Sequence, residues 1–230
     1  MADLFRLILE KKNEDVKLRL TETNINLNKG GFNLLWLAIN GRSARPRKTN
    51  TEFADYDLVH LLLEKGIDSQ KKCAQMTHLY SSMFHDRYDI SKLLLMYGAN
   101  PNEYSLLKVH KKRLICDMPL NIAIRKFRPD AVELLISYGA FYNLTTIEKV
   151  DTGIKLLHKD KEYTSYHTDR KKMHEILTIL KKYYNAEHEE TIKEFMLKSN
   201  KTGSYENFFP CFEKFPKPRS TLNRDYDFDY

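Results

Sequence analysis

Histidine and cysteine are the residues of this sequence that could ligate a metal ion or act as a nucleophile. His78 and His85 stand seven residues apart and flank one predicted helix, but the cysteines and carboxylates around them lack the spacing of a zinc site. His174-Glu175 is followed by Ile176-Leu177, so the second histidine of a His-Glu-x-x-His motif is absent. We therefore predict that these histidines pack in the core or lie on the surface, and that the chain holds no metal.

Cys116 beside Asp117 is the pair that comes nearest to a thiol nucleophile. It falls in a predicted connector, with no helix N-terminus to activate the thiol. The sequence also lacks the glycine-rich phosphate loop, the dinucleotide-binding turn and the Gly-x-Ser-x-Gly nucleophile elbow. We therefore predict an inert thiol, no cofactor and no enzymatic activity.

The elements that would position these residues are leucine-rich helices that end at a glycine. Glycine readily adopts the left-handed conformation that closes a helix. An aspartate stands nine residues before each glycine, where an acid suits the first helical turn. The glycines are Gly66, Gly98 and Gly139, and the aspartates are Asp57, Asp89 and Asp130.

A second landmark lies upstream of these helices. Leu79 and Leu120 each stand 19 residues before the glycine that ends the following helix. Pro119 suits the first position of a helix, where its missing N–H costs nothing. Leu35 stands 31 residues before Gly66, so that unit carries extra residues between its two helices. The pattern predicts pairs of helices that repeat along the chain.

These units resemble ankyrin repeats, whose signature is a Thr-Pro-Leu-His-like helix start, a leucine-rich second helix and then Gly-Ala-Asp-Val-Asn. Gly98-Ala99-Asn100-Pro101-Asn102 matches the last element best, although no unit has the full helix start. In a degenerate first unit, Asp15 takes the place of the acid and Asn24 that of the glycine, because asparagine tolerates the left-handed region. The resemblance implies an all-α solenoid of about four helix-pair units and a C-terminal helical cap.

The predicted solenoid covers residues 1–185, and residues 186–230 form a C-terminal helix and an irregular aromatic and acidic tail. The ranges within the solenoid are about 2–28, 29–70, 71–102 and 103–143 for the units and 144–185 for the cap, with cap helices at Thr146–Leu157 and Lys171–Tyr184. We interpret residues 207–216 as packing onto the last helices. The final six residues, 225–230, either pack likewise or form a linear motif for a partner.

The resemblance also implies a binding surface, formed by the connector tips and the first helix of each unit. The candidate residues, carried over by register, are Lys29, Phe32, Asn40, Met76, Phe84, His85, Asp117, Arg125 and Lys126. The repeat register makes Phe32, Met76 and Phe84 exposed, which suits a contact patch with basic rims. The alternative is that an inserted loop buries them. Trp36 and Tyr80 are expected to pack between units.

Two basic clusters fall in the predicted insertions, Arg42–Lys48 and Lys108–Arg113, and the second adds Lys111, Lys112 and Arg113 to the candidate binding residues. They could meet an acidic partner, act as a nuclear import signal or touch phosphate, and a solvated loop explains them equally well. The net charge of +7 is likewise compatible with an acidic partner and with an ordinary solvated surface. No base-stacking motif accompanies the charge.

We therefore expect a monomeric, non-enzymatic adaptor or effector that binds a protein partner. A basic scaffold for nucleic acid or an anionic membrane is the alternative. No stretch approaches the roughly 20 apolar residues of a transmembrane helix. Three distant cysteines give no disulfide framework, which favours a reducing, cytoplasmic location and leaves the nucleus open.

Overall fold

The computed structural model describes residues 3–21, 24–41, 54–109, 113–159, 166–185 and 189. Contacts between Cα atoms divide the chain into two compact units, Met1–Ser105 and Leu106–Tyr230. The described residues are mainly helical, as the sequence predicts. They also include two small two-stranded sheets. None of the helices in the described part of the chain combines the length and the apolar character needed to cross a membrane.

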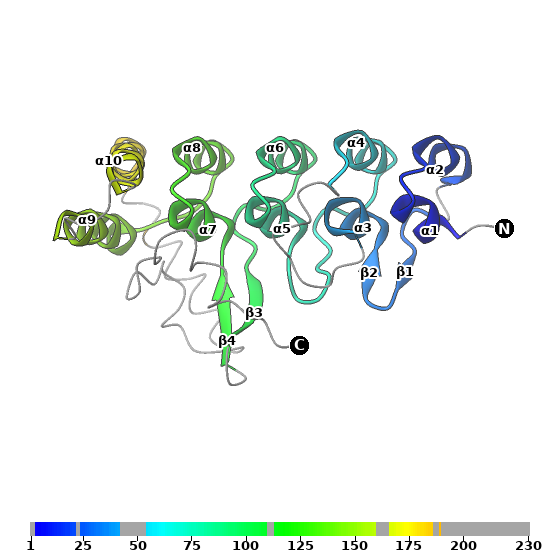
Figure 1. The fold of residues 1–230 in the computed structure, drawn as a ribbon, viewed down its shortest axis with the longest axis horizontal. Helices are drawn as coiled ribbons and strands as arrows, with labels where there is room; N and C mark the ends of the chain where they lie inside the picture. Colours follow the sequence, from blue (N-terminus) through cyan, green and yellow to red (C-terminus); the bar gives the residue numbers. More distant parts are fainter. Residues whose placement is uncertain are drawn as a thin grey trace. The chain divides into compact units, whose positions relative to one another are not determined.

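The described residues of the first unit contain three helix pairs and one short hairpin. The bounds of the helices are α1 Leu4–Leu9 with α2 Asn13–Arg19, α3 Leu34–Asn40 with α4 Tyr56–Glu64, and α5 His78–Phe84 with α6 Tyr88–Met96. The first helices α1, α3 and α5 contact one another in that order, and α4 contacts α6 (Figure 1). Strands β1 (Asn28–Lys29) and β2 (Phe32–Asn33) form a short antiparallel hairpin that leads into α3.

Polar side chains cap the N-termini of α3 and α5 in the first unit. The Oδ1 atom of Asn33 accepts a hydrogen bond from the backbone N–H of Trp36 (2.8 Å), which caps α3. Thr77 caps α5 in the same way, through the backbone N–H of Tyr80 (3.0 Å). Each such bond satisfies one of the N–H groups that a helix start leaves without an intrahelical partner.

Glycine ends the second helix in two of these pairs. Gly66 and Gly98 have φ values of 83° and 82°, the left-handed conformation that the sequence pattern predicts for them. Asn24 differs from its predicted role as a glycine substitute, because it is not among the residues of positive φ. Instead its side chain accepts from the backbone N–H of Thr21 (2.8 Å) and donates to the carbonyl of Arg19 (2.7 Å), so it caps the end of α2 by hydrogen bonds.

The aspartates of the predicted pattern lie in the first turn of each second helix. Asp15 stands there in α2, Asp57 in α4 and Asp89 in α6. A negative charge at this position interacts favourably with the positive end of the helix dipole. The hydrogen bond that caps α4 comes from Asp55, whose Oδ1 accepts from the backbone N–H of Leu58 (3.0 Å).

The second unit begins with a strand pair and continues with helices. Strand β3 (Ser105–Val109), whose first residue belongs to the first unit, pairs with β4 (Arg113–Asp117), although the sequence predicts only an insertion there. Helix α7 (Pro119–Arg125) packs against α8 (Pro129–Ser137), and α10 (Tyr166–Lys182) packs against α8 and against α9 (Leu144–Lys159). Asp130 lies in the first turn of α8, and Gly139 follows that helix with a φ of 82°.

Several predictions fall outside the described residues. These are the basic cluster Arg42–Lys48, the residues Lys111 and Lys112 of the second cluster, and the interpretations of residues 207–216 and 225–230. Arg113 is the first residue of β4. The predicted extent of the solenoid over residues 1–185 stays a prediction.

Candidate partner-binding surface

Three of the predicted binding residues of the first unit are accessible to solvent. Lys29, in the β1–β2 hairpin, exposes 69% of its side chain. Phe32 in the same hairpin and Phe84 at the end of α5 are half-buried. Each phenylalanine ring contacts a second ring that is itself buried: Phe32 stacks on Trp36, with centroids 5.9 Å apart, and Phe84 meets His85 edge-on at 5.6 Å. The positions of both phenylalanine rings are therefore restricted by contacts with buried rings.

Met76 does not lie on this surface, and the expectation that it is exposed is wrong. Its exposed fraction is 1%. Met76 and Cys73 exchange two backbone hydrogen bonds of 2.9 Å each, so the connector before α5 folds into a tight bridge. The bridge turns the Met76 side chain into the core, where the repeat register alone would leave it outside.

Asn40 and His85, two further candidates, are buried as well. Their exposed fractions are 1% and 3%. The Oδ1 atom of Asn40 lies 3.0 Å from Nε2 of His85 and also accepts a hydrogen bond from the Ser81 hydroxyl. This arrangement satisfies polar groups inside the contact between α3 and α5, so both residues are part of the core and are not a contact surface.

A second asparagine–histidine pair lies two helical turns away in the same contact. Oδ1 of Asn33 is 3.0 Å from Nε2 of His78, and both partners stand seven residues before those of the first pair. Seven residues are close to two turns of an α-helix, so the two pairs lie on one face of each helix. The spacing of His78 and His85 therefore serves the packing of α5 on α3.

His78 and Cys73 are the described residues of this region whose chemistry resembles a metal or nucleophile site. Burial lowers the pKa of His78 to about 4, so its imidazole is neutral near pH 7. Burial also raises the pKa of the Cys73 thiol, whose sulfur lies 3.9 Å from Nε2 of His78. Among the residues that the structure describes, no group of three or more His, Cys, Asp or Glu side chains is placed to hold a metal ion.

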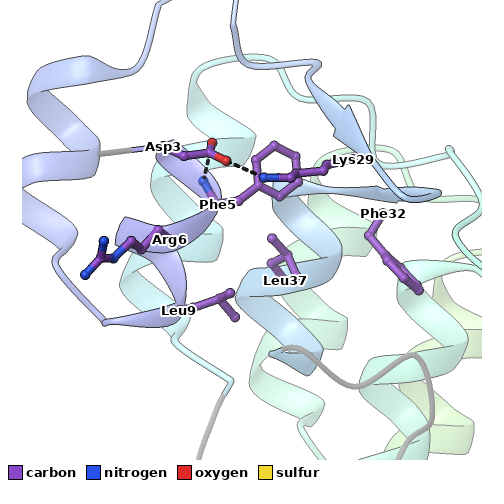
Figure 2. A pocket seen from close by; sticks show the side chains of 7 residues that line it. All are labelled: Asp3, Phe5, Arg6, Leu9, Lys29, Phe32 and Leu37. Carbon is purple, nitrogen blue, oxygen red and sulfur yellow. Dashed lines mark hydrogen bonds and ion pairs between the residues drawn. The ribbon is translucent and has the colours of Figure 1, made fainter. Parts of the chain in front are cut away.

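An open hollow of about 250 Å³ lies next to Lys29 and Phe32 (Figure 2). Its apolar lining comes from α1 and α3 as well as from the hairpin: Phe5 and Leu37 are buried, whereas Leu9 is half-buried. The residues that line it are Asp3, Phe5, Arg6, Leu9, Lys29, Phe32 and Leu37. Two of the predicted residues, Lys29 and Phe32, therefore line a hollow that the repeat register does not predict.

Two ion pairs border the hollow. Nζ of Lys29 lies 2.7 Å from Oδ2 of Asp3, and this hydrogen bond is the main cause that lowers the pKa of Asp3. The other oxygen of Asp3 accepts from the backbone N–H of Phe5 (3.2 Å), which caps α1. Nε of Arg6 lies 2.6 Å from Oε1 of Glu10, and hydrogen bonds from Arg6 and then Lys12 lower the pKa of Glu10 to about 2.

Two of the predicted residues of the second unit form an ion pair, Asp117 just before α7 and Arg125 at the last position of that helix. The carboxylate of Asp117 is almost fully buried, with 2% of the residue exposed, and Arg125 donates to both of its oxygens. Asp117 also accepts from the backbone N–H of Met118 (3.1 Å). Its prediction as a surface contact is therefore corrected to a structural role. Arg125 and Lys126 are half-buried, and their binding role stays a prediction.

Comparison with known proteins gives limited support for a family. No protein-family model matches the chain. An ankyrin repeat protein of Fowlpox virus (strain NVSL) is 29% identical to it over 113 residues, which are 47% of this chain and 36% of the viral protein. The chain thus spans about a third of the length of that relative. This similarity suggests the ankyrin-repeat family and agrees with the glycine-terminated helix pairs.

Proposed function

We propose that the chain is an ankyrin-repeat module that binds a protein partner through the first-helix surface of its first unit. We define this surface by Lys29, Phe32, Phe84 and the hollow beside α1 and α3. The proposal includes the predicted solenoid of about four helix-pair units with a C-terminal cap. The name of the viral relative supports the repeat family.

The observation that carries the proposal is the support beneath the two accessible phenylalanines. Phe32 rests on Trp36, whose exposed fraction is 0%, and Phe84 rests on His85. A side chain that is already ordered loses little conformational entropy when a partner covers it. Aromatic residues are also enriched where protein interfaces concentrate their binding energy. Two accessible rings that are ordered by their contacts, one of which (Phe32) lines a hollow, are therefore suited to protein recognition.

Helix α3, which lies next to this surface, is part of the core of the first unit. The hairpin that carries Lys29 and Phe32 leads directly into α3, whose seven residues are all buried. Helix α3 is held to α5 by the two asparagine–histidine pairs described above. The surface is thus anchored in the core of the unit.

Affinity capture with matched variants tests the proposal. The full chain is immobilised and exposed to a lysate, and the captured proteins are quantified for three forms. In one variant Phe32→Ser and Phe84→Ser are combined. In the control variant Leu18→Ser and Met96→Ser are combined, because these side chains are 82% and 61% exposed on the second helices α2 and α6.

We expect the phenylalanine variant to lose its specific partner at least tenfold, since truncation of a central aromatic contact typically costs about 2 kcal/mol or more. The control variant keeps the partner within about twofold, because Leu18 and Met96 lie on second helices, outside the proposed surface. Melting curves by circular dichroism verify that both variants remain folded. A partner that is retained equally by the two variants would place the binding surface elsewhere.

A further inference from the structure

We propose that the hollow beside α1 and α3 is the anchor site for an acidic segment of the protein partner. One large apolar side chain of that segment enters the hollow, and a carboxylate next to it pairs with Lys29. This inference rests on the proposed function and specifies the chemistry of the partner. It follows from the volume of the hollow, from its lining and from the charges at its border.

The volume and the lining select an apolar side chain. Cavities of about 150 Å³ lined by aliphatic and aromatic side chains accept benzene. The hollow here measures about 250 Å³, and Phe5, Leu9 and Leu37 line it (Figure 2). One phenylalanine or leucine side chain therefore fits, and its burial would remove apolar surface on both partners from water.

The charges at the border select an acidic segment. Lys29 exposes 69% of its side chain, whereas Asp3, its partner in the ion pair, exposes 43%. The same holds for the second ion pair, in which Arg6 exposes 68% and Glu10 33%. In both ion pairs the cationic side chain is more exposed to solvent than the carboxylate, which favours a negatively charged partner.

Lys29 retains hydrogen-bonding capacity for that partner. An ammonium group has three N–H donors. Within the described residues, Asp3 is the acceptor that Nζ of Lys29 contacts. A carboxylate of the partner can thus bind Lys29 without displacing Asp3.

The distances place both contacts within one short segment. Nζ of Lys29 lies 5.9 Å from the ring centroid of Phe5, which lines the hollow. Successive Cα atoms of a peptide are about 3.8 Å apart. Neighbouring residues of one segment can therefore supply the apolar side chain and the carboxylate together.

Nuclear magnetic resonance with three short peptides tests the inference on the full, isotope-labelled chain. The probe is acetyl-Gly-Glu-Phe-Glu-Gly-amide. One control replaces both glutamates with lysine, and the other replaces the phenylalanine with serine. We expect the probe to shift the amide signals of Leu9, Lys29 and Leu37, with a dissociation constant at least fivefold lower than that of either control. Equal affinity for all three peptides, or shifts elsewhere, would overturn the inference.

A pair of variants assigns the binding to the hollow. Leu9→Gln places a polar amide in its lining, whereas Leu18→Gln makes the same change at an exposed position of α2. The first change is expected to weaken the probe at least fivefold and the second to leave it within twofold. Lys29→Gln should remove the preference for glutamate over lysine. Unchanged binding in Leu9→Gln, with a native spectrum, argues against the inference.

The experiments distinguish a failure of the proposed binding surface from a failure of the proposed acidic anchor. If the phenylalanine variant loses a captured protein while the probe peptide causes no shift, the first-helix surface binds a partner but the acidic anchor is wrong. If capture is unaffected by that variant and the probe still binds at Leu9 and Lys29, the hollow recognises acidic segments while the wider surface proposed for the partner is wrong.

Discussion

Buried asparagine and histidine side chains decide how α3 and α5 meet. A polar group removed from water costs free energy unless it finds a hydrogen-bond partner. Asn33 and His78 provide one such partnership and Asn40 and His85 the other, at the same 3.0 Å distance. Because the pairs stand two turns apart, a shift of one helix along the other would break both of them. We infer that they fix the register of the two helices.

The buried imidazole of His78 makes the stability of the first unit depend on pH. Its pKa is about 4 in the folded chain and about 6.5 when the chain is unfolded. Between these values the unfolded chain binds a proton that the folded chain does not, so stability is complete above pH 6.5 and falls as the pH decreases toward 4. We expect the free energy of unfolding to drop by roughly 2–3 kcal/mol at pH 4.5 from this group alone.

Urea unfolding at pH 7.5 and pH 4.5 measures this loss, with His78→Gln as the comparison. Glutamine retains a hydrogen-bonding side chain but does not titrate. The native chain should therefore lose more stability between the two pH values than the variant does, since carboxylates such as Asp3 titrate equally in both. The same loss in the two proteins would show that His78 does not titrate with a lowered pKa.

The coupling between Asn40 and His85 can be measured with a double-mutant cycle. Removal of the Asn40 side chain leaves Ser81 and His85 without the oxygen that accepts from them. We expect Asn40→Ala to lower the free energy of unfolding by about 2 kcal/mol, because buried donors without partners carry a desolvation cost. Together with His85→Ala and the double variant, urea unfolding should give a coupling of at least about 0.5 kcal/mol. Additive effects would mean that the pair contributes nothing to the contact.

At the scale of the elements, three turns inside helix pairs, those of α1–α2, α5–α6 and α7–α8, use a residue in the left-handed conformation. Lys11, Asp86 and Phe127 have φ values of 55°, 58° and 54°, and each stands two residues before a second helix begins. The sequence pattern does not mark these positions, because none of them is a glycine. Their conformation follows from the closure of the helix pair, which outweighs the steric cost of roughly 1 kcal/mol.

The substitutions Lys11→Gly and Gly66→Ala should change the free energy of unfolding in opposite directions. Lys11→Gly removes the steric cost of a positive φ at an exposed position, so we expect a gain of up to about 1 kcal/mol in the free energy of unfolding. Gly66→Ala introduces that cost, because Gly66 has a φ of 83°, although open space surrounds the added methyl group. We expect a loss of about 1 kcal/mol. Chemical denaturation of both variants, each compared with the native chain, provides the measurement.

The helices were predictable because their signals are local, whereas the binding surface was predictable only in part. The glycines and the acids of the first turns stand in the same register along the sequence, and Trp36 and Tyr80 are buried as expected. Met76 was misplaced because a backbone bridge with Cys73, which no side-chain pattern reveals, turns it inward. The hollow was missed since it depends on how α1 faces α3, which is a tertiary contact.

At the scale of the whole molecule, the first unit contains its own core. The six helices that the structure describes within Met1–Ser105 bury their apolar side chains against one another, and both asparagine–histidine pairs lie within this range. A part of a chain that contains a complete hydrophobic core of its own can fold alone. The last residue of the unit contributes to it directly: the hydroxyl of Ser105, fully buried, accepts from the backbone N–H of Thr77 (3.0 Å) at the start of α5.

A fragment of residues 1–105 should therefore fold, and the same fragment with Ser105→Ala should be less stable by about 1 kcal/mol, because the change leaves the buried N–H of Thr77 without its acceptor. Trp36 is the one tryptophan of the chain and is completely buried, so its emission reports on this unit alone. Urea titrations followed by Trp36 fluorescence compare the two fragments, with circular dichroism as a check of helix content. Emission typical of exposed tryptophan in the unsubstituted fragment would show that the first unit needs the rest of the chain to fold, whereas equal stability of the two fragments would deny Ser105 its role.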